Sequence, residues 1–392
     1  MSVHQGQLIA MKKSYFFALL ISLGLQFFTS NLIAQQVSQN NGGVLSSASI
    51  LQSLRKLQVL GSVLYIAAHP DDENNSFLPY LAKEKMYRTG YLSLTRGDGG
   101  QNLIGPEQGI ELGMIRTKEL LAAREIDGAE QYFTSAYEFG FSKSMDEALQ
   151  VWDRKKVLAD AVWVIRNYKP DVIIARFPPD ARAGHGHHSA SAQIAREAFI
   201  AAADPSQFPE QLTNGVTIWQ AKRLLWNTFN FGGANTTSND QFKIDVGVYN
   251  ALEGKSYGEI GGEARSMHKS QGEGRPRRKG EVLEYFTTIL GEAPSQSLLD
   301  GVTLDWTRLG QHASGISASI DAAIAAYNPL QPALSLPILV GIYKQIKALP
   351  ESVWKSHKLQ AVQQIIEAAA GLSLEAITVS EKAVQGDTVS FT

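Results

Sequence analysis

The stretch 63–73, Val-Leu-Tyr-Ile-Ala-Ala-His-Pro-Asp-Asp-Glu, decides how this chain folds. Its first six residues are apolar without alternation, which is typical of a strand buried on both faces of a parallel sheet. The imidazole of His69 and the carboxylates of Asp71, Asp72 and Glu73 follow directly. Because ligands of open α/β sheets bind at the carboxyl ends of the strands, we expect these side chains at a functional edge of the sheet.

Strand and helix patterns alternate on both sides of this stretch. Further strand signals occupy residues 90–94, 172–177, 224–230 and 241–246. Helical patterns occupy residues 47–60, 113–126, 146–167, 189–203 and 256–269. A strand that alternates with a helix indicates βαβ units, so the chain is predicted to form a doubly wound, mostly parallel sheet with helices on both faces.

A chain of 392 residues is longer than one hydrophobic core supports, so more than one domain is expected. After about residue 292 the pattern becomes helical and rich in alanine, and it ends in an alternation typical of a strand, a turn and a strand. The predicted parts are a signal peptide (1–34), a linker and helix (35–58), a catalytic domain (59–292), a helical module (293–375) and the beginning of a possible truncated β-domain (376–392).

The first 34 residues have the order of a secretory signal peptide. Lys12 and Lys13 precede an apolar run over 15–28, and small and polar residues follow at 31–35. The run is too short to cross a bilayer, and the alternative is a buried N-terminal helix. We expect an exported protein, periplasmic or secreted, with no integral membrane span once the leader is removed.

Composition excludes several classes of function. The chain has no cysteine, which rules out disulfides, thiolate zinc sites, iron–sulfur clusters and cysteine nucleophiles. Any transition metal must therefore be held by nitrogen and oxygen. The formal net charge is −2 and no block of lysine and arginine stands out, so no nucleic-acid partner is expected.

Two separate segments offer metal ligands. His69 and Asp72 lie three residues apart around Pro70, so both can reach one metal, while Asp71 stays free as a base. Further histidines stand in the stretch 184–188, after another predicted strand. Two histidines and one carboxylate leave a coordination position open for water, and zinc lowers the pKa of that water, which predicts hydrolysis. The alternatives are a helix N-cap at the first segment and a solvated loop at the second.

These segments resemble the PIG-L/LmbE-like zinc-dependent de-N-acetylases over about residues 62–286. The resemblance also includes the stretch 94–100, Leu-Thr-Arg-Gly-Asp-Gly-Gly, and residues 116–128. It implies a Rossmann-like fold, one Zn²⁺ per chain, and removal of acetyl groups from substrates of the N-acetylglucosamine type. The implied metal ligands are His69, Asp72 and His188. The implied catalytic residues are Asp71, as the general base, and His185, as an acid or oxyanion stabiliser.

One departure from the family pattern affects His185. The second motif of the family usually has the order His-Pro-Asp-His, whereas Gly186 and His187 occupy the middle positions here. The aspartate of that motif is thought to support the first histidine. Either Asp180 or Glu107 is a candidate for the missing carboxylate, and the sequence does not distinguish them.

The resemblance also suggests substrate-binding residues. Arg96 and Asp98 are expected to border the substrate pocket, and the alternative is a glycine turn with a surface ion pair. His268 and Gln271 are expected to hydrogen-bond sugar hydroxyls. A helix end capped by Gly272 explains the same two residues nearly as well.

Together these features predict a zinc-dependent amide hydrolase that acts on an N-acetylated sugar, a small molecule or an oligosaccharide, or on a related amide. Two alternatives come from other classes. The same ligand set occurs in Fe²⁺ enzymes with two histidines and one carboxylate, although those usually have β-barrel folds. The other alternative is a glycan-binding protein whose metal site is vestigial. The identity of the substrate stays open.

Overall fold

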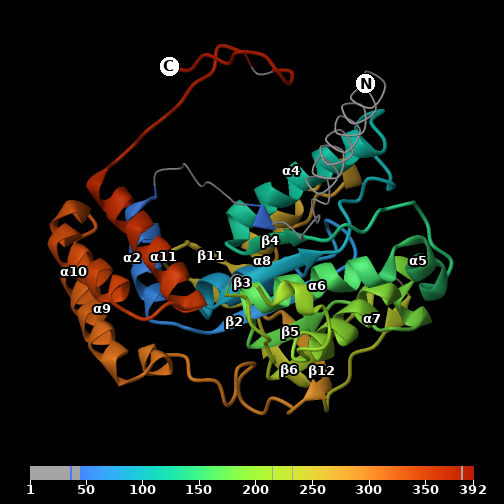
Figure 1. Ribbon diagram of the computed structural model, residues 1–392, viewed down its shortest axis with the longest axis horizontal. Coiled ribbons are helices and arrows are strands. Elements are labelled where there is room, and N and C mark those ends of the chain that lie inside the picture. The colour runs from blue at the N-terminus through green and yellow to red at the C-terminus, as the bar shows by residue number, and fades with distance from the viewer. Residues whose placement is uncertain (1–35, 38–44, 214, 232, 381–382) are drawn as a thin grey trace, which may run out of the picture. The chain divides into compact units, whose positions relative to one another are not determined.

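The computed structural model describes residues 36–37, 45–213, 215–231, 233–380 and 383–392. The predicted signal peptide over residues 1–34 lies outside this part of the chain. The centre of the fold is an eight-stranded sheet with the strand order β1-β4-β3-β2-β5-β6-β12-β9 (Figure 1). Its strands are β1 (Gln36–Val37), β2 (Ser62–Ala67), β3 (Arg88–Ser93), β4 (Glu130–Phe133), β5 (Val172–Ala175), β6 (Arg223–Thr228), β9 (Phe242–Asp245) and β12 (Leu283–Gly291).

The five strands from β4 to β6 are parallel, and β1, β12 and β9 pair antiparallel at the two sides. The predicted α/β class with a mostly parallel sheet is therefore confirmed. The chain adds β3 and β4 on one side of β2, and then adds β5 and β6 on the other side. This reversal makes the gap between β2 and β5 the switch point, where open sheets bind ligands.

Helices cover both faces of the sheet because successive side chains of each strand point to opposite faces. Leu64 and Ile66 of β2 share a core cluster with residues of three helices, whereas Val63, Tyr65 and Ala67 belong to a cluster on the other face. The first face is covered by α5 (Met145–Val151), α6 (Arg154–Tyr168) and α7 (Gly186–Ala201). The second face is covered by α3 (Phe77–Pro79), α4 (Ile110–Asp127) and α8 (Tyr257–Arg265).

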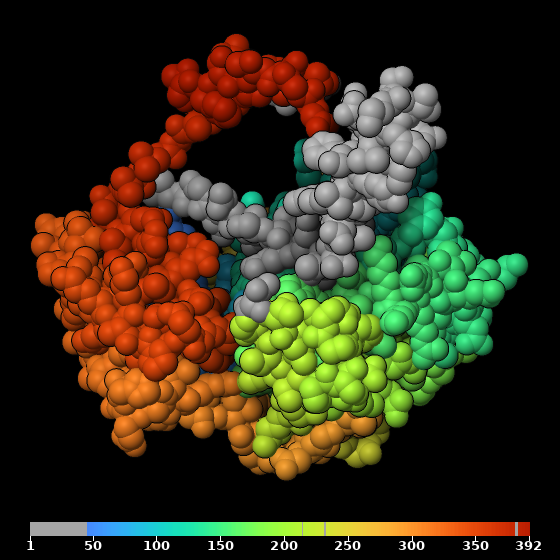
Figure 2. Space-filling view, viewed as in Figure 1, coloured from blue at the N-terminus to red at the C-terminus, as the bar shows by residue number. Residues whose placement is uncertain are grey.

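A separate helical core combines residues from before and after the sheet. It consists of α2 (Ser47–Leu57), α9 (Ser314–Ala326), α10 (Leu336–Lys347) and α11 (Val353–Ala370). Figure 1 shows α2, in blue, beside α11, in red, and Figure 2 shows the orange and red helices as one continuous surface. The buried Nζ of Lys358 donates hydrogen bonds of 2.6 Å to the carbonyls of Lys56 and Val59, at the end of α2. The predicted boundary at residue 292 stays a prediction.

The expected helix over residues 146–167 is wrong in one respect, because the structure contains two helices, α5 and α6. Trp152 has an extended backbone and donates from Nε1 to the carbonyl of Tyr137 at 2.7 Å. Asp153 then starts α6, since its side chain accepts from the backbone N–H of Lys156. An aspartate N-cap in the middle of an apolar pattern therefore marks the break.

Three strands of the central sheet, β1, β4 and β12, have no counterpart in the sequence-based expectations. The strand β4 begins with Glu130 and Gln131, so it lacks an apolar run. The strand β12 lies between β6 and β9, and its register shifts between Thr288 and Leu290. Near the chain end, the expected strand-turn-strand segment makes one antiparallel bridge, between Thr378 and Phe391.

None of the helices in the described part of the chain combines the length and the apolar character needed to cross a bilayer.

Candidate metal centre

The loop after β2 is fixed by hydrogen bonds within itself and to the sheet. The Oδ2 of Asp72 accepts the backbone N–H of His69 at 2.7 Å, and Tyr91 Oη donates to the carbonyl of His69 at 2.5 Å. Asp71 has a φ of 101°, which is uncommon for a residue other than glycine. This strained turn sits at the switch point of the sheet, where such conformations are often associated with function.

Asp71 is held by Arg116 of α4. The Arg116 guanidinium donates to Asp71 Oδ1 at 3.0 Å, to the carbonyl of Pro70 at 2.7 Å and to that of Gly97 at 3.1 Å. Arg265 of α8 contacts the carbonyl of Asp71, and its Nη2 lies 3.7 Å from Asp71 Oδ2. Burial raises the pKa of Asp71, although Arg116 opposes the shift. A carboxylate with a raised pKa is a better general base.

Glu73 stabilises the same loop from the protein interior. Its side chain is completely buried, where it accepts from Arg124 at 3.1 Å and contacts His268 Nε2 at 2.9 Å. Its Oε2 also accepts the backbone N–H of Asp71 at 2.9 Å. Burial opposes the ionisation of Glu73, but His268 and Arg124 hold its pKa well below the usual range. The loop therefore rests on a buried ion-pair network.

The three predicted metal ligands lie together. Asp72 Oδ2 is 3.0 Å from His69 Nδ1, and Asp72 Oδ1 is 3.2 Å from His188 Nε2. The Nδ1 of His188 is 2.8 Å from the carbonyl of Ala183, an acceptor, so Nδ1 carries a proton. In a neutral ring Nε2 then presents a lone pair to a carboxylate oxygen. An imidazolium N–H would also suit this distance, but two nitrogens and one oxygen that converge in this way are a donor set that fits a metal ion.

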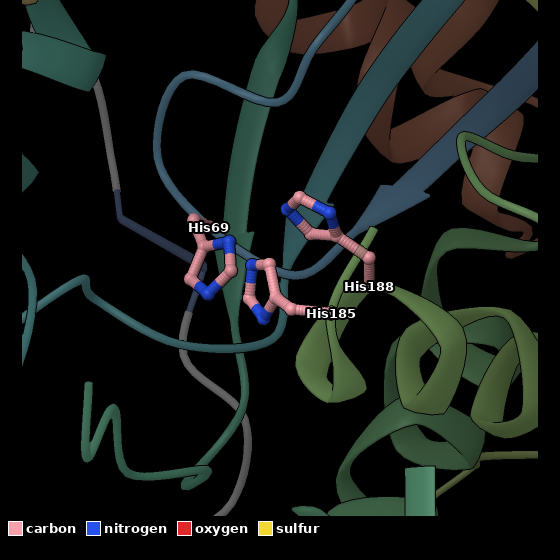
Figure 3. Close-up of side chains that lie close together, drawn as sticks. All are labelled: His69, His185 and His188. Atoms are coloured by element: carbon pink, nitrogen blue, oxygen red, sulfur yellow. The ribbon is translucent and has the colours of Figure 1, made fainter. Parts of the chain in front are cut away.

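The electrostatics of the centre favour positive charge. Burial alone lowers the pKa of His69, but the carboxylates of Asp72 and Glu138 raise it to about 10. Burial likewise opposes the ionisation of Asp72, yet His188 and His69 hold its pKa well below the usual value. The ligand atoms of His69, His185 and His188 all lie within 4.8 Å of one another. Figure 3 shows these three imidazoles gathered at one point.

His185 stands at the N-cap of α7, with its ring stacked 5.3 Å from that of His69. Its Nδ1 is 3.2 Å from Ser142 Oγ, which accepts the backbone N–H of His187 at 2.7 Å. The hydroxyl hydrogen of Ser142 is therefore free to bond Nδ1, which places the proton of His185 on Nε2. Burial and the neighbouring imidazoles of His188 and His69 lower the pKa of His185 to about 3. The ring is thus a neutral donor.

Neither carboxylate proposed as the partner of His185 occupies that position. Asp180 forms an ion pair with Arg182 at 2.7 Å, and Glu107 accepts from Asn102 at 3.0 Å. The contact that the structure gives to His185 Nδ1 is the hydroxyl of Ser142. Ser142 was not identified from the sequence because it lies in a loop far from both motifs.

Arg96 and Asp98 both line a cavity of about 490 Å³. Arg96 lies over the ring of Phe133, 4.1 Å from its centroid, and Lys118 and Tyr137 line the same cavity. Burial raises the pKa of Asp98. Ile110, Met114 and Ala136 also line the cavity, so its lining is mainly apolar with a few polar groups, as in most small-molecule sites.

The structure does not support the expected contacts of His268 and Gln271 with substrate. His268 is completely buried and contacts Glu73, so it stabilises the loop after β2 from the protein interior. Gln271 donates from Nε2 to the carbonyl of Gln101 at 2.8 Å. Gly272, with a φ of 65°, ends the short helix over Lys269–Gln271, as the alternative interpretation expected.

Glu138 is the residue of this centre that sequence reasoning missed. It lies in the loop between β4 and α5, and its Oε2 is 2.6 Å from His69 Nε2 and 3.3 Å from His187 Nδ1. The ligand atoms of His69, Glu138 and His187 form a second cluster, also within 4.8 Å. A single glutamate between two aromatic residues offered no motif by which to find it.

Comparisons with known proteins agree with the geometry. Residues 64–199 match the family model PIG-L, described as GlcNAc-PI de-N-acetylase. The 1D-myo-inositol 2-acetamido-2-deoxy-alpha-D-glucopyranoside deacetylase 2 of Frankia casuarinae is 30% identical over 183 residues, 41% of this chain and 55% of that protein. A probable N-acetylglucosaminyl-phosphatidylinositol de-N-acetylase of Schizosaccharomyces pombe is 27% identical over 171 residues, 42% of this chain and 60% of that protein.

The chain therefore spans somewhat more than half the length of these two relatives. The solved N,N'-diacetylchitobiose deacetylase of Pyrococcus horikoshii is similar at 19% identity over 53% of this chain and 70% of that chain, with a TM-score of 0.40. The resemblance to the PIG-L family is confirmed over residues 64–199.

Proposed function

We propose that this protein is a zinc-dependent hydrolase that removes the acetyl group from an N-acetylated sugar, of the N-acetylglucosamine kind, or from a related amide. The observation that carries the proposal is the meeting of His69, Asp72 and His188 at the switch point, with Asp71 beside them. The family match over residues 64–199 supports deacetylation as the reaction.

His69, Asp72 and His188 would hold the metal through two nitrogens and one oxygen. Three protein ligands leave one position open, as in catalytic zinc sites. A zinc ion bound there would supply an acidified water and polarise the carbonyl of the amide. Iron with the same three ligands is the competing assignment, and metal analysis of protein purified with and without air separates the two.

The side chains around this position can move the protons of the reaction. Asp71 accepts a proton from the attacking water, and Arg116 holds the carboxylate in place through Oδ1. The Nε2–H of neutral His185 donates to the carbonyl oxygen as negative charge develops on it. The C–N bond then breaks, and the proton on Asp71 passes to the leaving nitrogen. One amide and one water thus give acetate and an amine.

The cavity lined by Arg96 and Asp98 is a candidate subsite beside the metal centre, and none of the proposed metal ligands belongs to its lining. It is connected to the metal centre through one contact, since Asp98 Oδ1 accepts the backbone N–H of Glu138 at 3.4 Å. Export of the protein is proposed on the basis of residues 12–35, which have the order of a signal peptide.

The test is acetate release from a panel of N-acetylated sugars and amides, with zinc content measured in parallel. We expect Asp71→Ala to keep its zinc and lose turnover by about 10²- to 10⁴-fold, because the proton acceptor is removed. His188→Ala should lose both zinc and turnover. Asp240→Ala, a change at an exposed aspartate away from the centre, is the matched control and should behave as the wild type.

Full activity in Asp71→Ala would refute the base assignment. No acetate from any compound, together with measurable affinity for saccharides, would instead favour the glycan-binding alternative.

A further inference from the structure

The loop between β4 and α5 brings a second carboxylate to His69. Asp72 Oδ2 faces Nδ1 of His69, whereas Glu138 Oε2 lies 2.6 Å from the other ring nitrogen, Nε2. The side chain of Glu138 is only 4% exposed, so water does not compete effectively for its oxygens. His69 is therefore contacted by a carboxylate at each nitrogen.

The orientation of the Glu138 carboxylate is fixed. Its Oε1 accepts the backbone N–H of Gly140 at 2.9 Å, which turns Oε2 towards the histidines. His187 lies on the other side of Oε2, with Nδ1 at 3.3 Å. The ring of His187 is completely buried between Trp152, stacked at 5.0 Å, and the edge of Phe139. Oε2 thus faces both imidazoles, and His69 Nε2 also lies 3.3 Å from His187 Nδ1.

Packing explains how this loop comes so close. The carbonyl of Ser142 accepts the backbone N–H of Gly186 at 2.9 Å, and Ser142 Oγ accepts that of His187 at 2.7 Å. A Cβ added to Gly186 would lie 2.0 Å from the carbonyl oxygen of Ser144. The glycine at position 186 therefore admits the loop that carries Glu138.

A neutral histidine that binds a metal through one ring nitrogen must carry its hydrogen on the other ring nitrogen. For Nδ1 of His69 to offer a lone pair, Nε2 must carry the hydrogen, and a buried N–H requires an acceptor. Glu138 Oε2, 2.6 Å away, is the acceptor nearest to that nitrogen. The alternative tautomer would direct a lone pair at the carboxylate and an N–H at the metal position.

We propose that Glu138 is a positioning residue for the metal: it holds His69 in the tautomer and orientation that bind the ion through Nδ1. This inference rests on the proposed function, because it assumes a metal at His69. The usual aspartate of the second family motif is absent, Ser142 contacts His185, and the buried carboxylate of the centre comes from a different loop.

The test is the zinc affinity of Glu138→Gln, measured by titration of metal-free protein against a competing chelator. The amide oxygen of glutamine can keep the bond to Gly140 N–H, which turns its NH₂ group towards the donors of His69 and His187. We expect the zinc affinity to fall by about 10- to 100-fold, the usual effect of removing such a partner. Glu138→Asp keeps a carboxylate and should show a smaller loss.

Two matched controls come from the carboxylates first considered for the missing partner. Glu107→Gln and Asp180→Asn should bind zinc as the wild type does, because these residues bond Asn102 and Arg182. Urea unfolding of each metal-free variant shows whether it folds. If Glu138→Gln fails to fold, the comparison of Glu138→Asp with the wild type decides the question.

Wild-type zinc affinity in a folded Glu138→Gln would overturn the inference and leave the proposed function intact. A purely structural role of Glu138 would lower the urea midpoint without changing the zinc affinity of the folded protein, which would also overturn it. If the wild type itself binds no divalent metal, the proposed function fails and the inference fails with it.

Discussion

Replacing Gly186 by alanine tests whether the loop over residues 138–144 packs on the histidine motif as described. The added Cβ would lie 2.0 Å from the carbonyl oxygen of Ser144 and 2.7 Å from Ser142 Oγ. The first of these is a backbone atom, so no side-chain rotation relieves the overlap. The loop must move by more than about 1 Å to reach an ordinary contact distance.

The magnitude follows from three contributions. Two hydrogen bonds, from the backbone N–H groups of Gly186 and His187 to Ser142, are weakened, and each contributes about 1 kcal/mol. Overpacking costs about 1 to 3 kcal/mol. The higher helix propensity of alanine offsets about 1 kcal/mol of this loss. We therefore expect the free energy of unfolding to fall by about 2 to 4 kcal/mol.

Activity should fall as well, because the same loop carries Glu138 and Ser142. A displacement of about 1 Å at a catalytic group commonly lowers the rate about 100-fold. Urea unfolding and acetate release measure the two effects. Gly315→Ala in α9 is the matched control, since nothing lies within 4 Å of its added Cβ, and it should gain about 0.5 to 1 kcal/mol. Wild-type stability and activity in Gly186→Ala would refute the described packing.

Three further predictions concern the metal and the helical core. Removal of zinc with a chelator should abolish acetate release. Adding zinc back at 100 times its Kd should raise the free energy of unfolding by about 2.7 kcal/mol. The same addition should not change the stability of His188→Ala. Lys358→Met should lose about 2 kcal/mol in urea unfolding, because the carbonyls of Lys56 and Val59 lose a buried donor, and unchanged stability would contradict this. Burial lowers the pKa of His357 from 6.5 to about 4 in the folded protein. As the pH falls from 6.5 to 4, the unfolded chain therefore binds a proton that the folded chain does not, and the free energy of unfolding decreases by up to about 3 kcal/mol. His357→Leu should show a correspondingly smaller fall over the same pH range, and an identical pH profile would exclude this cause.

The central sheet could be predicted because its signals are local. The apolar run over residues 63–68 corresponds to β2, and the patterns after it correspond to β3, β5 and α7. Since the carboxyl ends of β2 and β5 adjoin at the switch point, the meeting of His69 with His188 follows from topology. Local sequence patterns, combined with one rule of sheet topology, were therefore sufficient to predict that His69 and His188 meet.

The remaining features depend on contacts between distant segments. The burial of His268 against Glu73 and the approach of Glu138 to His69 have no counterpart in any short stretch of sequence. The same applies to Ser142, whose role is defined by the turn at Gly186. The strand β4 is stabilised by its neighbours in the sheet and does not need an apolar run of its own, whereas the aromatic and β-branched residues of β12 are a local strand signal that the sequence-based interpretation missed.

The packing of α2 against α9, α10 and α11 has a consequence for the order of folding. A ribosome synthesises α2 before the sheet and its partner helices after it, so the apolar side chains of Ile50, Leu54 and Leu57 have no complete core until α11 emerges. A nascent chain that has finished the central sheet has not yet covered these apolar side chains. The helical core can therefore be completed only after α11 has been synthesised.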